Sequence, residues 1–280
     1  MKYSLSRWCQ FFERTRQAYY KLIDHCLQLE LWDQLIVAEV KKIRHRQPRV
    51  GTRKLHRMVN EQLKSEGIQI GRDRLFKLLQ AEDLLMHRRK NAKQTTDSRH
   101  RLNKYGNRIR DLEISRPNQV YVSDITYVET LLGFCYLALI TDAYSRKIVG
   151  YDLSRSLSVE GSLRALQMAL AQLSGPIQLI HHSDRGLQYC SHAYVDLLRA
   201  HGIQISMTEE QHVYGNAKAE RVNGILKSEF LLGEQLASFD VAHNQVKEAI
   251  QIYNNERLHL SLNYQTPAMM HETVSPLQVC

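Results

Sequence analysis

Hydrophobic residues near the start of the chain recur every three or four positions, which predicts helices. Residues 5–27 give two short helical patterns that break at 13–15. A longer amphipathic helix is expected over 29–46. It should end there, because Pro48 disfavours helical backbone at the residue before it. The first two patterns predict a short helix-turn-helix-like segment over residues 1–28.

Residues 29–90 are predicted to form a helical DNA-binding domain that contains a helix-turn-helix. Thr52 is expected to cap one helix, Gly67 to end it and Gly71 to open the next. Basic side chains lie on this region's outward positions, and the candidate DNA contacts are Arg53, Lys54, Arg72, Arg74 and Lys77. A solvated, charged face on an ordinary helical hairpin is the alternative interpretation.

The pattern becomes strand-like after a basic, aperiodic segment at 91–117, which is predicted to be a linker that can follow DNA phosphates. Three strand-like runs come next, "NQVYVSDITYVET", "GFCYLALITDAYS" and "KIVGYDLS". They are followed by a helix over 158–173, a strand over 176–181, a helix over 192–201 and a strand over 203–207. This order predicts an α/β fold with a five-stranded mixed sheet and flanking helices.

Composition adds little to this picture, because 43% hydrophobic and 24% charged residues are ordinary for a globular protein. The longest apolar run, Leu131 to Ile140, is too short to span a bilayer, so no membrane association is expected. The N-terminus lacks the apolar block of a secretory signal. The five cysteines form no C-x-x-C pair, which favours a reduced, cytoplasmic protein without a zinc site.

Charge divides the chain into two parts of opposite sign. Residues 1–110 contain 26 Lys and Arg against 11 Asp and Glu, whereas residues 111–280 contain 12 against 18. A basic segment is typical of a protein that binds a polyanion, most often nucleic acid. A cationic surface that serves only solubility is the alternative.

Three acidic residues stand out in the predicted sheet and the helix after it. Asp124 lies inside the first strand, and Asp184 follows the fourth strand in "HHSDRGLQY". A buried, unpaired Asp is costly, so Asp124 must be hydrogen-bonded or face positive charge. Glu220 lies on a helix expected from about residue 216, on one face with Asn216, Asn223 and Lys227. For each residue alone, a solvated loop or helix surface is the simpler reading.

Together these residues resemble the Asp-Asp-(35)-Glu signature of the retroviral-integrase-like catalytic core, a ribonuclease H-like fold. "SDITY", "HSDRGLQY", "NAKAERVNGILKSEF" and "YNNERLHLSLNYQTPA" resemble the transposases of bacterial insertion sequences. The likeness is to the large family with two reading frames, of which the second encodes the catalytic part, and it covers nearly the whole chain. Gly215 departs from the pattern, because many relatives carry Asp there.

The resemblance implies a catalytic core over 118–235, completed by a C-terminal helix and tail over 236–280. It also implies two Mg²⁺ ions, with Mn²⁺ as a substitute, held by Asp124, Asp184 and Glu220. Asp124 would bridge the two ions. Lys227 is a further candidate DNA contact, Asn216 and Tyr189 are candidates for contacting DNA or shaping the site, and His181 and His182 are expected to steady the loop.

The activity implied is metal-dependent nicking and strand transfer at the ends of an insertion sequence. DNA partners would be the terminal inverted repeats and the target, bound by a homo-oligomer at the bacterial nucleoid. In this family the active species is often a frameshift fusion to an upstream-frame product with a helix-turn-helix and leucine zipper. A ribonuclease H-like nuclease that only hydrolyses, and a non-catalytic DNA-binding regulator, are the alternatives.

Overall fold

The computed structural model describes residues 4–86, 102–174, 178–209 and 216–273. Two compact units make up the chain. The first comprises Met1–Arg46 and Val50–His87, and the second comprises Gln47–Arg49 and Arg88–Cys280. None of the helices in the described ranges has the length and apolarity to cross a membrane.

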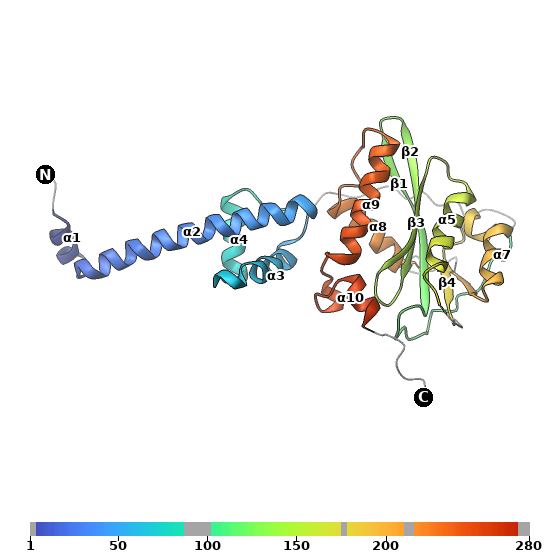
Figure 1. Ribbon diagram of the computed structural model, residues 1–280, viewed down its shortest axis with the longest axis horizontal. Helices are drawn as coiled ribbons and strands as arrows, with labels where there is room; N and C mark the ends of the chain where they lie inside the picture. The colour runs from blue at the N-terminus through green and yellow to red at the C-terminus, as the bar shows by residue number, and fades with distance from the viewer. Residues whose placement is uncertain (1–3, 87–101, 175–177, 210–215, 274–280) are drawn as a thin grey trace. The chain divides into compact units, whose positions relative to one another are not determined.

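The first unit is all-helical (Figure 1). Its elements are α1 (Leu5–Phe11), α2 (Arg16–Arg46), α3 (Thr52–Gln62), the short 3-10 helix η1 (Lys64–Glu66) and α4 (Arg72–Ala81). Buried aliphatic side chains of α2, α3 and α4 form its core, with Leu55, Leu75 and Leu79 fully enclosed. The turn before α4 is fixed by Asn60, whose side chain accepts from the N–H of Ile70 at 2.8 Å and donates to its carbonyl at 3.0 Å.

One long helix, α2, replaces the two helices expected on either side of residue 29. The predicted break was wrong because "LIDHCLQLELW" contains neither Gly nor Pro and is rich in good helix formers. The expected boundary between segments 1–28 and 29–90 therefore falls inside a helix. Thr52 is the first residue of α3, and Gly51 rather than Thr52 occupies the cap position.

The second unit contains a five-stranded mixed sheet, which confirms the predicted fold class. Its strands are β1 (Val120–Thr130), β2 (Gly133–Asp142), β3 (Ile148–Ser154), β4 (Ile180–Ser183) and β5 (Gln204–Met207), in the order β3-β2-β1-β4-β5. The first three strands form an antiparallel meander, and β4 and β5 add to β1 in parallel. Three consecutive hairpin-linked runs in the sequence account for the meander.

Helices cover both faces of this sheet (Figure 1). On one face pack α5 (Val159–Leu170), α6 (Leu187–Cys190) and α7 (His192–Ala200). On the other pack α8 (Ala217–Glu229) and α9 (Phe239–Asn255). The chain then forms η2 (Leu260–Leu262) and α10 (Pro267–Glu272). Because both faces are covered, the central strands are apolar on both sides.

The second half of the expected linker packs on the sheet instead of standing free. Residues 87–101 lie outside the described part of the chain, but Leu102 and Tyr105 pack against the core on the α5 side. The carbonyl of Gly106 accepts from the N–H of Met207 at 3.3 Å, and the N–H of Arg108 donates to the Ser206 hydroxyl at 2.9 Å. These contacts cover the edge of β5, so this half is a part of the second unit.

A buried carboxylate at the end of β2 organises the turn into β3. Asp142 is fully enclosed and accepts hydrogen bonds from the backbone N–H groups of Asn118, Tyr144 and Ser145 at 2.7–3.1 Å. The Ser145 hydroxyl also bonds Asp142, at 2.8 Å, and lies 3.0 Å from Nδ1 of His271 on α10. This chain of contacts attaches the C-terminal helix to the sheet.

Candidate active site

The parallel pairing of β1 and β4 explains why two of the three predicted carboxylates lie close together. Ser123 of β1 and Ser183 of β4 are register partners, and Asp124 and Asp184 are the next residues on the two chains. Neighbouring residues at the same level of a parallel pair lie side by side. The register therefore brings the two carboxylates together, although 59 positions separate them in the sequence.

Asp124 is tightly held. Its Oδ2 accepts a hydrogen bond from Nδ2 of Asn223 at 2.7 Å, and its Oδ1 accepts from the N–H of Ile125 at 2.9 Å. Burial, followed by the nearby charge of Asp184, raises the pKa of Asp124 to about 7 despite these hydrogen bonds, and Glu220 adds to the shift. The charges of Asp184 and Glu220 therefore both act on Asp124.

Asp184 begins the turn into α6. Its Oδ1 accepts from the N–H of Gly186 at 2.9 Å. A Cβ atom at Gly186 would approach the same oxygen to 2.9 Å, so a larger residue there would push the carboxylate aside. Gly186 was missed by the sequence analysis, because nothing in the sequence marks its approach to Asp184.

Glu220 reaches the region from α8, which Asn216 anchors to the sheet. Nδ2 of Asn216 donates to the carbonyl of Ser123 at 2.9 Å, next to Asp124 on β1. Asn216 is buried, so of its two expected roles the burial favours shaping the site over contact with DNA. Glu220 itself is exposed, three residues before Asn223, which bonds Asp124. Helical spacing had placed Asn223 on one face with Glu220, but the hydrogen bond to Asp124 was not predicted.

The oxygen donors here have the right chemistry for a hard divalent cation, which prefers carboxylate and amide oxygens. The buried Oδ1 atoms of Asn216 and Asn223 have no hydrogen-bond partner within the described ranges. A cation would also relieve the repulsion that raises the pKa of Asp124. In the described side-chain positions, however, no three acidic, His or Cys residues are grouped closely enough to hold one ion. The residue types fit a metal, and the exposed Glu220 side chain would have to turn inward.

Lys227 lies on the same face of α8, two turns beyond Glu220. Its side chain is half-buried, and this burial lowers the pKa of its ammonium group while the charge of Asp124 opposes the shift. The positive charge of Lys227 is therefore within electrostatic reach of Asp124. Such a group can hold an anion beside the carboxylates.

Tyr189, His181 and His182 are part of the core beneath the site. Tyr189 is buried and packs edge-on against Tyr194, which does not fit the expected contact with DNA. Nε2 of His181 lies 2.7 Å from the Ser123 hydroxyl and 2.9 Å from the Tyr194 hydroxyl. Nδ1 of His182 lies 2.8 Å from the Ser206 hydroxyl. Burial lowers the pKa of His181 to about 3, so this ring is neutral at physiological pH.

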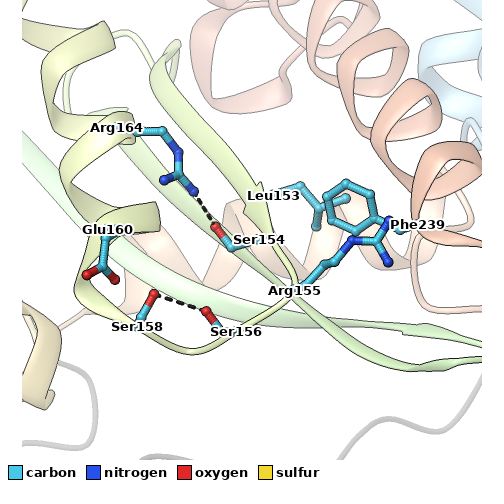
Figure 2. Close-up of a pocket in the computed structure, with 8 residues that line it drawn as sticks. All are labelled: Leu153, Ser154, Arg155, Ser156, Ser158, Glu160, Arg164 and Phe239. Carbon is cyan, nitrogen blue, oxygen red and sulfur yellow. Dashed lines mark hydrogen bonds between the residues drawn. The ribbon is translucent and has the colours of Figure 1, made fainter.

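A separate open pocket of about 610 Å³ lies between the end of β3 and the start of α5 (Figure 2). Arg155 stacks over the Phe239 ring, and Arg164 donates to the Ser154 hydroxyl at 2.9 Å. Arg164 also forms a bidentate pair with Asp152 at 2.8 Å, which neutralises its charge. With Glu160 opposing Arg155 in the lining, the pocket has no net positive charge and contains none of the three carboxylates.

The candidate DNA contacts of the first unit differ in how exposed they are and in whether they form an ion pair with an acidic residue. Lys54 is buried, which is at odds with its expected role. Arg74 pairs with Asp33 of α2 at 2.7 Å, and Arg72 pairs with its neighbour Asp73 at 2.9 Å. Arg53 and Lys77 are exposed. The basic surface is therefore smaller than the sequence suggested.

Known proteins resemble the chain over most of its length. Two models described as "Integrase core domain" match residues 114–212 and 201–267. The "uncharacterized 31 kDa protein" of insertion element IS600 from Shigella sonnei is 36% identical over 269 residues, which is 94% of this chain and 97% of the relative. The transposase for insertion sequence element IS629 from the same organism is 33% identical over 238 residues, covering 84% and 78%.

A solved structure supports the fold alone. The simian T-cell lymphotropic virus intasome, in complex with the PP2A regulatory subunit B56 gamma, matches with a TM-score of 0.50 and 16% identity. The match covers 82% of this chain and 78% of that chain. The sequence relatives and the two core-domain matches confirm the resemblance stated from the motifs. The chain belongs to the family of insertion-sequence DDE transposases, which share the integrase-type catalytic core.

Proposed function

We propose that this protein is a DDE-type polynucleotidyl transferase that nicks DNA at the ends of its insertion sequence and joins them to target DNA. The observation that carries the proposal is the register of β1 and β4, which puts Asp124 and Asp184 at the same level of adjacent strands. The electrostatic effect of Glu220 on Asp124 adds the third carboxylate.

The family depends on a divalent metal, and we propose that Asp124, Asp184 and Glu220 are its ligands here. Two bound Mg²⁺ ions, or Mn²⁺ in their place, would activate the attacking oxygen and stabilise charge on the leaving oxygen. Asp124 is suited to the central position, because Asn223 and the N–H of Ile125 fix both of its oxygens. Gly186 keeps Asp184 oriented through the hydrogen bond to Oδ1.

The proposed reaction has two phosphoryl-transfer steps. In the first, water attacks the phosphorus at the element end, the P–O3′ bond breaks, and a 3′-hydroxyl is released. In the second, that hydroxyl attacks a phosphorus of the target strand, a new P–O3′ bond forms, and the target's own 3′-oxygen leaves as a hydroxyl. Neither step requires a covalent enzyme intermediate. Lys227 would hold a phosphate of the element end beside Asp124.

DNA binding is assigned to the basic first unit, with Arg53 and Lys77 as the exposed candidates. The proposed ligands are the terminal inverted repeats and the target DNA. Transposases and integrases act as oligomers on DNA, and we propose the same for this protein, at the bacterial nucleoid. A fusion or partnership with an upstream-frame product is a further proposal, carried by the family resemblance alone.

The test is the substitution Asp184→Asn in the full chain. We expect nicking and strand transfer on duplexes carrying the element ends to fall by at least about 10³-fold, because the proposed metal site loses one of its charged oxygen ligands. Binding to the same duplexes should change less than about twofold, because the basic unit supplies it. Asp196→Asn, at an exposed aspartate of α7, removes the same charge away from the site and should leave both activities intact.

Equal loss of binding and nicking in Asp184→Asn would contradict this division of roles. Unchanged nicking would favour the non-catalytic regulator. Hydrolysis without any joined product, in the unmodified protein, would favour the nuclease that only cleaves. Neither alternative is favoured by an observation on this molecule.

A further inference from the structure

The C-terminal motif "YNNERLHLSLNYQTPA" has no part in the chemistry proposed above, and its first residues bind the sheet. The Tyr253 hydroxyl donates to the carbonyl of Arg146, in the turn between β2 and β3, at 3.1 Å. The Asn254 side chain accepts from the N–H of Ile148 and donates to its carbonyl, both at 2.9 Å. These contacts fix the end of α9 to the edge strand β3, and Arg257 follows two residues later.

Arg257 reaches α8, the helix that carries Glu220. Its guanidinium donates two hydrogen bonds to the Glu229 carboxylate, from Nε at 2.9 Å and from Nη2 at 2.7 Å. Both side chains are mostly buried, with 6% of the Arg257 side chain and 20% of the Glu229 side chain exposed. A bidentate pair of this kind fixes orientation as well as distance, because two parallel bonds join two planar groups. The pair therefore joins the last residue of α8 to the segment that follows α9.

The ion pair supplies a directional contact at the C-terminal end of α8. Buried apolar side chains hold this helix on the sheet, but the burial of apolar surface is not directional. Two directional hydrogen bonds lie nearer the N-terminus of the helix, one from Asn216 to β1 and one from Asn223 to Asp124. Glu229 lies nine positions after Glu220, about 180° around the helix. The ion pair therefore restrains α8 from the side opposite to Glu220.

We propose that Arg257, acting through Glu229, is a positioning residue that holds α8 in the orientation from which Glu220 and Lys227 act. The inference rests on the proposed function, which assigns Glu220 to the metal and Lys227 to a phosphate. A buried ion pair adds little net stability over apolar side chains of similar size, because desolvation of the two charges offsets most of their attraction. What the bidentate pair adds is a fixed orientation between the two segments it joins.

The first experiment is the substitution Arg257→Lys in the full chain. Lys keeps the positive charge but does not form two parallel hydrogen bonds with one carboxylate. We expect the maximal rate of nicking on duplexes carrying the element ends to fall at least about 10-fold, because a small misplacement of a group in the site is costly. The dissociation constant for Mn²⁺, measured by electron paramagnetic resonance without DNA, should rise at least about 10-fold, because Glu220 is the displaced ligand.

Two further variants separate orientation from stability. Glu229→Leu/Arg257→Met removes the ion pair without leaving a buried charge, so the protein should stay folded by circular dichroism and urea unfolding. Its nicking rate and Mn²⁺ affinity should still be reduced as in Arg257→Lys. The matched control is Arg164→Lys, which disrupts a bidentate pair with Asp152 between α5 and β3. This control should leave the nicking rate and the Mn²⁺ affinity unchanged, because α8 is not involved.

A folded Glu229→Leu/Arg257→Met protein with normal nicking and normal Mn²⁺ affinity would overturn the proposal. Failure of both this variant and Arg257→Lys to fold would also overturn it, because the pair would then serve the stability of the unit. An unmodified protein that binds no Mn²⁺ would contradict the proposed metal site itself. Mn²⁺ binding that is present in the unmodified protein and unchanged in both variants would overturn only the positioning role of Arg257.

Discussion

At the scale of single residues, Asp124 carries an unusual proton affinity. Its pKa in the folded chain is about 7, compared with 3.8 for an ordinary aspartate, because burial and two neighbouring carboxylates oppose its charge. The folded state therefore holds a proton that the unfolded state releases between about pH 4 and pH 7. Stability contributed by this proton is present at low pH and is lost as the pH rises through that window.

We expect this loss to appear as a difference between the unmodified protein and Asp124→Asn in the presence of a chelator. From pH 4 to pH 7.5, the free energy of unfolding of the unmodified protein should fall relative to the variant, with an upper limit of about 4 kcal/mol. Urea titrations at each pH measure it. His181, whose pKa is lowered to about 3, changes stability in the opposite direction but equally in both proteins.

Addition of Mg²⁺ at pH 7.5 provides the matching control. It should raise the unfolding temperature of the unmodified protein and leave that of Asp124→Asn nearly unchanged, because only the former has the full set of carboxylates. A pH profile identical in the two proteins would contradict the electrostatic coupling of Asp124 to its neighbours.

The sequence predicts the role of a residue only where a characteristic spacing between residues marks that role. Asp124, Asp184 and Glu220 were predicted from a motif, and their catalytic role stays a prediction. The burial of Lys54 and Tyr189 could not be read from the sequence, because both residue types are common on surfaces and in interiors. For Asn216 the sequence left contact with DNA and shaping of the site both open, because its buried contact with Ser123 depends on how α8 lies on β1.

At the scale of elements, the packing of α5 on β3 depends on a glycine. A Cβ atom at Gly150 would overlap the backbone carbonyl of Ala165 on α5 and lie 3.0 Å from Cβ of Ala169. We expect Gly150→Ala to destabilise the protein by roughly 1–3 kcal/mol, because the helix must move away from the sheet. Denaturant unfolding measures the difference.

Gly224 on α8 is the matched control for that substitution. A Cβ atom there would meet nothing within 4 Å, and the residue is inside a helix. Gly224→Ala should therefore stabilise the protein by roughly 0.5–1 kcal/mol, through the helix propensity of Ala. If both substitutions changed stability by the same amount and sign, close packing at Gly150 would not be the cause.

Element type was predictable where periodicity was strong, and element length was not. The three strands of the meander and the helices α5 and α7 were each predicted within a few residues of their observed bounds. The single helix α2 was predicted as two, because local apolar periodicity does not show where a helix continues without packing. The segment from Leu102 was predicted as a linker because its few apolar residues are irregularly spaced.

At the scale of the whole molecule, the two parts of the sequence differ in charge. The first 110 residues have a net charge of +15 and the remaining residues −6, from 26 and 12 basic against 11 and 18 acidic side chains. Binding to DNA releases counterions in proportion to the phosphates that are neutralised. The salt dependence of binding should therefore be set by the first 110 residues, which comprise the first unit and the basic segment 88–110 at the start of the second.

We expect Arg53→Ala/Lys77→Ala to reduce the slope of log K against log salt by about 2, at about 0.9 per phosphate contact. The loss should be similar for random-sequence duplexes, because phosphate contacts carry no base information. Lys247→Ala, at an exposed position of α9, should leave the slope unchanged. Fluorescence anisotropy over a series of salt concentrations measures the slope for all three proteins. An equal effect of Lys247→Ala would contradict the assignment of DNA binding to the first unit.

The three carboxylates of the candidate site lie on two kinds of element. Asp124 and Asp184 come from paired strands of one sheet, whereas Glu220 comes from a helix laid against it. A slide or rotation of α8 would move Glu220 and Lys227 together and would also break the hydrogen bond by which Asn223 holds Asp124. A substitution that tilts this one helix should therefore disturb Asp124 as well as Glu220, while Asp184 keeps its hydrogen bond to Gly186.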